Sequence, residues 1–192
     1  MRTCRLRGGV GARMDVLDIE RADGTRTKVS LRRFTRGKTR DRPEHVAHEY
    51  RVLQFVAAAE IPAPRPLLLD AEGEVFGVPA IVLTYLSGAP LYLPRDIDSW
   101  TKQLAQALLR VHAVTPRTHD LSWLHVQLQD GIRETIETDR SRVDTHSNLA
   151  REVHAALVEE IDKIEWIDAT LVHDDFWPGN TVWFRGDRKS VV

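Results

Sequence analysis

The order of strand-like and helix-like segments constrains the fold of this chain more than any other feature. Residues 5–34 carry strand candidates separated by turns, and residues 43–61 carry an apolar stripe at helical spacing. Two more strand candidates follow at 67–70 and 78–85, and beyond residue 87 the pattern becomes mainly helical. Because strands and helices do not alternate, we expect an α+β fold with two lobes, an antiparallel-sheet N-lobe and a mainly helical C-lobe.

The first lobe has the turn and alternation signals of an antiparallel sheet. Asp23 and Gly24 form the Asp-Gly pair that is typical of a tight hairpin. The strand candidate that follows alternates with period two, so its side chains divide between two faces. One face is predicted to carry Val29, Leu31 and Arg33, and the other Lys28, Ser30 and Arg32. A turn at 87–90 marks the predicted lobe boundary, which gives lobes of residues 1–86 and 87–192.

Two amphipathic helices are predicted in the second lobe. The first has Asp98 as its N-cap, carries an apolar stripe and ends before Pro116. The second runs from about residue 148 to 161, and its apolar residues are Leu149, Val153, Leu157 and Ile161. The polar segment between the helices, 113–147, shows a partly helical pattern only at 132–139.

Charge and cysteine content exclude several classes of protein. The chain has 27 basic and 28 acidic residues and a formal net charge of −1, so bulk electrostatics predict no binding to nucleic acid or to a membrane surface. No apolar run approaches the roughly 20 residues needed to span a bilayer. The single cysteine, Cys4, excludes an internal disulfide and fits a reducing compartment, so we expect a cytoplasmic protein.

One loop near the end of the sequence has residue types that suit chemistry. His173, Asp175 and Asn180 have the spacing His-x-Asp-x₄-Asn, which is typical of a kinase catalytic loop. The carboxylate of Asp175 can orient a hydroxyl and accept its proton, and the amide oxygen of Asn180 can bind Mg²⁺. The alternative interpretation is a surface turn with incidental acidic residues.

The whole stretch 171–184 resembles the catalytic loop of the aminoglycoside phosphotransferase and choline kinase family. Three earlier segments are also similar to that family in order and spacing: 49–53, 61–67 and 81–88. The resemblance implies a protein-kinase-like fold with ATP between the lobes. It makes 1–86 the nucleotide-binding lobe and 87–192 a partial catalytic lobe.

The resemblance also implies which residues of the first lobe bind nucleotide. Gly8, Gly9 and Gly11 match a glycine-rich phosphate loop, although a plain β-turn is the alternative. Arg32 lies where the family has a Lys or Arg that reaches the α- and β-phosphates, and Glu49 would pair with it. Arg32 is one of seven arginines between positions 21 and 42, so a solvated role is the competing interpretation. The hinge that meets adenine would be the backbone of Thr84, Tyr85 and Leu86; an ordinary strand end is the alternative.

In the second lobe, the resemblance implies that Asp175 is the catalytic base and Asn180 a Mg²⁺ ligand. The sequence departs from the family at two points. Asp174 stands where the family most often has Gly, and we expect its side chain to point outward. The family continues into a strand ending in a second Mg²⁺-binding Asp, whereas this chain reaches Val192 first. Asp187 is in a predicted hairpin turn and is not a substitute.

These observations lead to two hypotheses of different classes. The first is ATP- and Mg²⁺-dependent phosphorylation of a hydroxyl on a small molecule, such as an antibiotic, an amino alcohol or a sugar. The second is a catalytically inactive, truncated chain that at most binds nucleotide or a partner. In the second case, exposed apolar surface of the C-terminal lobe would favour self-association.

Overall fold

The computed structural model describes residues 2–5, 12–35, 43–124, 129–138, 147–165, 168–184 and 190–191. The chain forms two compact units. Unit 1 comprises Met1–Val114 and Leu171–Val192, and unit 2 comprises Thr115–Thr170. The predicted division into lobes after residue 86 does not follow these units and stays a prediction.

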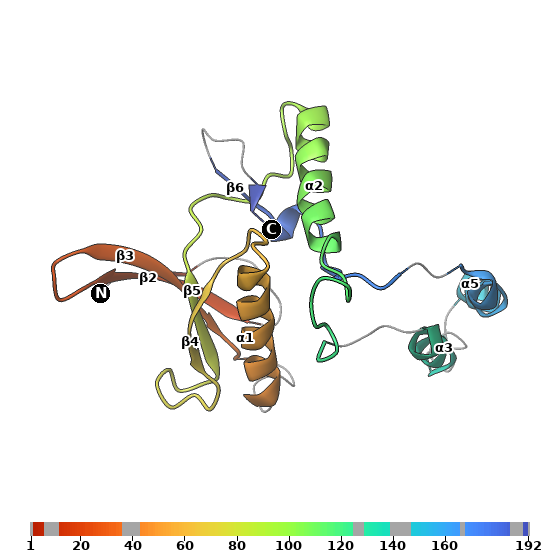
Figure 1. Cartoon of the computed structure of the whole chain (residues 1–192), viewed down its shortest axis with the longest axis horizontal. Helices are drawn as coiled ribbons and strands as arrows, with labels where there is room; N and C mark the ends of the chain where they lie inside the picture. The colour runs from red at the N-terminus through yellow and green to blue at the C-terminus, as the bar shows by residue number, and fades with distance from the viewer. Residues whose placement is uncertain are drawn as a thin grey trace. The chain divides into compact units, whose positions relative to one another are not determined.

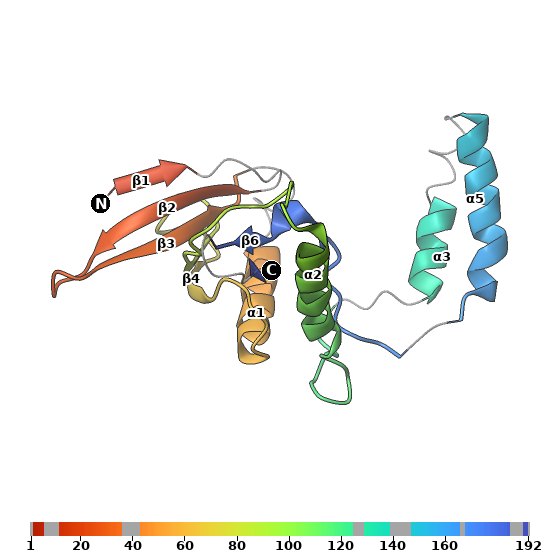
Figure 2. The same cartoon turned by 90° about the horizontal axis from the view of Figure 1, so that it is seen from above.

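Unit 1 is built on a five-stranded antiparallel sheet (Figures 1 and 2). The strand order is β1-β2-β3-β5-β4, and helix α1 lies between β3 and β4 in the sequence. The bounds of these elements are β1 Arg2–Arg5, β2 Arg13–Glu20, β3 Arg26–Arg33, α1 Pro43–Ala58, β4 Pro66–Asp70 and β5 Ala80–Thr84. The predicted antiparallel sheet is therefore confirmed, and the turn at Gly24 (φ 80°) closes the β2–β3 hairpin as the Asp-Gly pair indicated.

The two faces of the sheet bury separate apolar clusters. Val29 and Leu31 pack with Leu17, Ala80 and Val82 on one face. On the opposite face, Phe34, Ile81 and Leu83 form a cluster with Val46 of α1, and Tyr50 and Leu53 of the same helix pack against it. The period-two alternation of β3 thus correctly predicted that Arg32 and Arg33 leave the sheet on opposite sides. Arg32 is on the side covered by α1.

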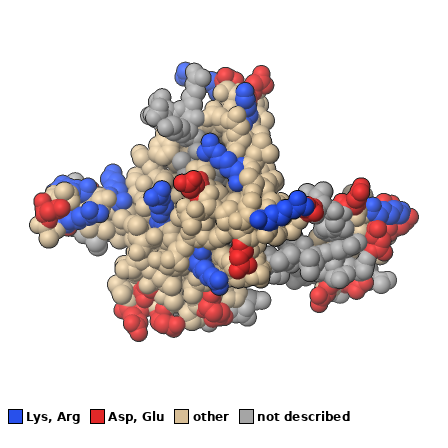
Figure 3. Space-filling model, in the orientation of Figure 1, with Lys and Arg blue, Asp and Glu red and all other residues tan. Residues whose placement is uncertain are grey.

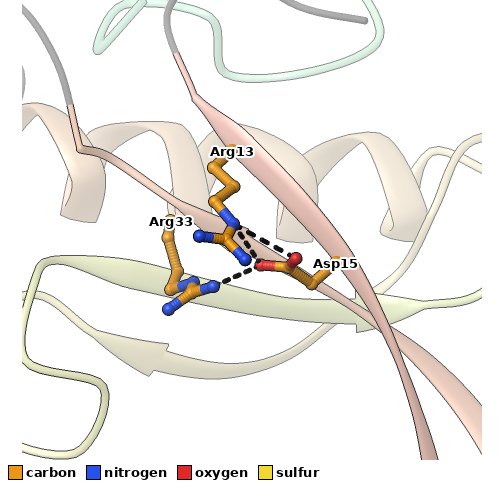
Figure 4. Close-up of polar contacts among 3 residues, drawn as sticks. All are labelled: Arg13, Asp15 and Arg33. Carbon is orange, nitrogen blue, oxygen red and sulfur yellow. Dashed lines mark hydrogen bonds and ion pairs between the residues drawn. The ribbon is translucent and has the colours of Figure 1, made fainter. Parts of the chain in front are cut away.

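A buried carboxylate joins β2 to β3 near one end of the sheet. Asp15 is only 4% exposed, and its side chain lies between the guanidinium groups of Arg13 and Arg33 (Figure 4). Burial acts to raise the pKa of Asp15, but hydrogen bonds from Arg33 and Arg13 and their positive charges outweigh it. The net result is a pKa below the ordinary value of 3.8.

We expect Asp15→Asn to lower the free energy of unfolding by about 1–3 kcal/mol at pH 7, because the partly buried guanidinium of Arg33 and the exposed one of Arg13 lose their charged acceptor. A lowered pKa in the folded state stabilises the fold above pH 4 and loses this effect as the pH falls through the folded-state pKa. Urea unfolding at pH 7 and at pH 3 should therefore show a difference between wild type and variant that shrinks in acid. Asp18→Asn, on the same strand, is the control; equal losses in both variants would contradict the prediction.

The remainder of unit 1 contains one long helix and a short hairpin. Helix α2 spans Ile97–His112, and its N-cap is Asp96, whose side chain accepts a hydrogen bond from Ser99 N at 2.9 Å. The prediction of Asp98 as the cap was wrong by two residues, because Asp98 lies inside the first turn. A 3-10 turn, Pro178–Asn180, leads into strand β6 (Val182–Trp183), which pairs with β7 (Ser190–Val191).

The described part of unit 2 contains two helices that lie side by side, α3 (Gln129–Thr138) and α5 (Asn148–Glu160), followed by a 3-10 turn at Ile161–Lys163 (Figure 2). His154 of α5 contacts the backbone oxygen of Ile136 at 2.7 Å. The predicted apolar stripe of α5 is present, but Leu149, Val153 and Leu157 are each at least half exposed. Only Ile161, just beyond the helix, is buried.

Charged side chains of both signs are interspersed over the face drawn in Figure 3, in keeping with the balanced composition. Among the helices of the described residues, none combines the length and apolar character required to cross a membrane.

Candidate active site

An ion pair joins the centre of the sheet to α1. Arg32 Nη1 of β3 lies 3.0 Å from Glu49 Oε1 of α1, so the pairing that the family resemblance implied is formed. The side chains remain 39% and 30% exposed, respectively. Burial raises the pKa of Glu49 above its ordinary 4.5, and attraction to Arg32 offsets part of this rise. The pair therefore holds the Arg32 cation at the sheet surface, although burial disfavours the charged form of the Glu49 carboxylate.

The guanidinium of Arg32 has binding capacity beyond Glu49. Its Cζ lies over the ring of Phe34, 5.4 Å from the ring centroid. Its Nε is buried and has no hydrogen-bond partner among the residues that the structure describes. Guanidinium carries five N–H donors in a planar fork that suits phosphate oxygens. Because only Nη1 contacts Glu49 and the side chain stays partly exposed, Arg32 can hold Glu49 and still present N–H donors to an anion.

The loop 173–180 brings Asp175 and Asn180 together. Asn180 Nδ2 donates to Asp175 Oδ2 at 2.7 Å and to the Asp175 backbone oxygen at 2.9 Å. Both residues are exposed, so other groups can reach them. The His173 ring packs edge-on against Phe176 with centroids 5.5 Å apart, and its Nδ1 is buried without a partner within the described part of the chain.

The backbone at Asp174 explains why a glycine would suit that position. Its φ is +65°, in the left-handed region that most L-residues avoid and that Asp and Asn tolerate better than most. Asp174 is exposed, and the next peptide turns back so that Asp175 N donates to His173 O at 2.8 Å. This tight turn presents the Asp175 carboxylate to Asn180.

Gly179 packs closely against a side chain of the same loop. A Cβ at this position would lie 2.3 Å from the ring of Trp177, which is far closer than real contacts allow. Asn180 N donates to Trp177 O at 2.9 Å and completes the turn. Gly179 therefore lets the loop fold over Trp177 and return to Asp175.

Strand β6 connects this loop to the segment that follows the predicted hinge. Ala89 and Trp183 form an antiparallel bridge, with N···O distances of 3.0 and 3.2 Å. A Cβ on Gly88 would lie 2.5 Å from Trp183 O, so the close approach of the two segments depends on glycine. Leu171 N also donates to Val114 O at 2.9 Å, which ties the start of the loop to the residues after α2.

The predicted hinge residues lie at the end of β5 and just after it, and Thr84, the last residue of the strand, is already hydrogen-bonded. Thr84 N donates to Arg65 O at 2.9 Å, and Thr84 Oγ1 accepts from Arg65 N at 2.8 Å. Tyr85 lies under the Lys28 ammonium, 5.8 Å from its ring centroid, and Leu86 is partly buried. The Thr84 amide is therefore not free to meet adenine, which leaves Tyr85 and Leu86. The predicted Gly8, Gly9 and Gly11 lie outside the described residues.

The donor set fits one side of a magnesium site. Because Asn180 Nδ2 faces Asp175, Asn180 Oδ1 is left as a hard oxygen donor beside a carboxylate. Mg²⁺ in phosphate sites is commonly held by one or two carboxylates together with phosphate oxygens and water. In the described ranges, no three His, Cys, Asp or Glu residues gather to hold a metal. Any metal at Asn180 would thus take further ligands from phosphate, from water or from groups outside these ranges.

Comparison with known proteins identifies the family. A model described as the phosphotransferase enzyme family matches residues 10–192, and the chain belongs to that family. This confirms the resemblance that the loop and its three companion segments indicated. A search of curated proteins gave no match.

Solved structures support the fold. A Ralstonia eutropha JMP134 protein, described as a candidate aminoglycoside phosphotransferase, has a TM-score of 0.73 at 17% identity. The alignment covers 98% of this chain and 56% of that one. Spectinomycin phosphotransferase APH(9)-Ia, solved with ADP and spectinomycin, has a TM-score of 0.55 at 13% identity, over 99% of this chain and 62% of that one. The two-lobed, kinase-like α+β fold is thus confirmed, and the chain spans less than two thirds of either neighbour.

Proposed function

We propose that the chain carries the nucleotide and metal side of an ATP-dependent phosphotransferase that acts on a hydroxyl of a small molecule. The observation that carries this proposal is the contact between Asp175 and Asn180, on a loop of the spacing that phosphoryl transfer uses. Membership of the phosphotransferase enzyme family supports it. The neighbour solved with ADP and spectinomycin is consistent with a nucleotide and a small-molecule acceptor.

Each residue has a distinct role in this proposal. Asp175 orients the acceptor hydroxyl and takes its proton, while Asn180 Oδ1 binds the metal. Arg32, oriented by Glu49, contacts phosphate oxygens, and the backbone of Tyr85 and Leu86 meets the adenine edge. Mg²⁺, when bound, would neutralise charge on the phosphates, where most catalysis of this type arises. We also propose that Gly8, Gly9 and Gly11 cover the phosphates.

The direct test combines nucleotide binding with group transfer. We expect ATP with Mg²⁺ to raise the melting temperature, and label from γ-³³P-ATP to appear on at least one acceptor in a panel of aminoglycosides, amino alcohols and sugars. Folded protein with neither effect would contradict the proposal. A rise in melting temperature without transfer to any acceptor would favour the alternative of an inactive nucleotide-binding chain.

Self-association and a cytoplasmic location stay predictions. The exposed side chains of Leu149, Val153 and Leu157 give α5 an apolar face that a second copy could cover. Sedimentation velocity over a hundredfold range of concentration would decide this, since a constant sedimentation coefficient at the monomer value would exclude self-association.

A further inference from the structure

A fully buried threonine follows directly on the residue that contacts Asp175. Thr181 follows Asn180 and is 0% exposed. Its Oγ1 donates to Pro178 O at 3.0 Å and accepts a hydrogen bond from Trp183 Nε1 at 3.1 Å. The Thr181 amide also points at Pro178 O, at 3.3 Å. The hydroxyl therefore binds the carbonyl of the first residue of the Pro178–Asn180 turn and uses both its donor and an acceptor site.

The partner of this hydroxyl is itself fixed on two sides. The Trp183 ring stacks on Trp100 of α2, with centroids 6.3 Å apart and planes at 23°. The Trp183 backbone forms the bridge to Ala89 described above. Thr181 thus connects the turn that carries Asn180 to α2 and to the segment after the hinge. Hydrogen bonds that meet at one buried hydroxyl in this way hold their partners rigidly when every member is satisfied.

We propose that Thr181 is a positioning residue for the metal-binding side of the site. Its hydroxyl holds the Pro178 carbonyl and so fixes the Pro178–Asn180 turn. With the turn fixed, Asn180 Nδ2 faces Asp175, and Asn180 Oδ1 is left for a cation. The role in metal binding rests on the proposed function, whereas the positioning of the Asn180 side chain is a property of the ligand-free protein.

The hydroxyl is required by chemistry rather than by volume. Valine has the shape of threonine and would fill the same space, but it would leave Trp183 Nε1 without its acceptor and Pro178 O with only the Thr181 amide as a donor. Serine would keep the hydroxyl and lose only a methyl group. Thr181→Val and Thr181→Ser therefore form a matched pair in which only the first removes the proposed function of the residue.

The experiment has one readout that needs no ligand and one that does. Side-chain ¹⁵N–H₂ resonances, with Asn180 assigned through Asn180→Ala, report whether the amide is held against Asp175. Electron paramagnetic resonance measures the affinity for Mn²⁺ in the presence of a non-hydrolysable ATP analogue. In Thr181→Val we expect the Asn180 resonance to move to the position of a solvent-exposed amide and Mn²⁺ affinity to fall about tenfold, the scale of outer-shell changes around metals. In Thr181→Ser the Asn180 resonance should keep its wild-type position, and the Mn²⁺ affinity should stay within about twofold of wild type.

The Thr181 variants and the wild type each have a result that overturns part of the proposal. A folded Thr181→Val protein that keeps the wild-type Asn180 resonance and Mn²⁺ affinity overturns the proposal, because a purely structural threonine would alter only stability. If Thr181→Val does not fold, Thr181→Cys, with a weaker donor of similar size, takes its place in the comparison with Thr181→Ser. If the wild type itself binds no Mn²⁺ with nucleotide, the proposed function and the metal role both fail. The Asn180 resonance still decides whether Thr181 positions that side chain.

Discussion

Replacing Asp175 by Asn should lower the rate of phosphoryl transfer by about 10²–10⁴-fold, the usual contribution of a positioned general base. An amide cannot accept the hydroxyl proton, and it offers Asn180 Nδ2 a neutral acceptor in place of a carboxylate. The substitution replaces one carboxylate oxygen by an amide nitrogen on an exposed side chain, so the fold should persist. The rate is measured by release of ADP at saturating ATP and Mg²⁺, with the acceptor found in the panel above.

The matched control for this variant is the preceding residue. Asp174→Asn removes the same charge one position earlier, and asparagine tolerates the φ of +65° at that site. We expect its rate to stay within about threefold of wild type, because the Asp174 side chain has no role in the proposed chemistry. Equal losses in the two variants would show that local negative charge, and not the Asp175 carboxylate, drives the reaction. An unchanged rate in Asp175→Asn would remove Asp175 as the base.

The sequence predicted those parts of the fold that depend on local pattern. The alternation of β3 placed Arg32 and Arg33 on opposite faces, because side chains of a strand alternate whatever surrounds them. The Asp-Gly pair located a hairpin for an equally local reason, since glycine adopts the positive φ of the turn. Asp175 and Asn180 were found because their spacing is itself the signal of the loop that brings them together.

Other features depend on contacts between distant segments, which no local pattern reveals. Asp15 is an acid in a strand that alternates poorly, and nothing in the sequence pairs it with Arg33, 18 residues later. One local feature was also missed: Asp70 accepts hydrogen bonds from the nearby amides of Glu74, Val75 and Phe76, although its sequence context indicated only a strand end. The engagement of the Thr84 amide by Arg65 required the β4–β5 register. Thr181 gave no sequence signal, because a threonine next to a strand is ordinary.

The second large effect is expected at the sheet. Arg32→Met should lower kcat/KM for ATP about 10²-fold, comparable to the loss of one preorganised donor at a developing charge. Methionine keeps most of the length and apolar contact of the arginine side chain, including its packing near Phe34. The kinetic change should therefore come from the missing guanidinium rather than from a cavity. The measurement is the ATP dependence of the initial rate at saturating Mg²⁺.

The adjacent residue is the control for this variant, because Arg33 leaves β3 on the other face and contacts Asp15. Arg33→Met should lower the free energy of unfolding by roughly 1–3 kcal/mol, since Asp15 then keeps only Arg13, while kcat/KM for ATP stays within about threefold. The two substitutions should thus separate kinetics from stability at neighbouring positions. A similar loss of kcat/KM in both would indicate that the charge of the sheet as a whole attracts ATP, and would leave Arg32 without a specific role.

The pH dependence of Arg32→Met provides an independent check through Glu49. Burial already raises the pKa of Glu49, and loss of the Arg32 charge removes the attraction that opposes the rise. A carboxyl whose folded-state pKa exceeds its unfolded value stabilises the fold below the unfolded value, near 4.5, and loses this effect as the pH rises through the folded pKa. Arg32→Met should therefore lose more stability relative to wild type at pH 8 than at pH 4.5, and adding Glu49→Gln should flatten the difference. If the loss is the same at both pH values, the ion pair does not hold Glu49 in its charged form, and Glu49 cannot be what orients Arg32 toward a phosphate.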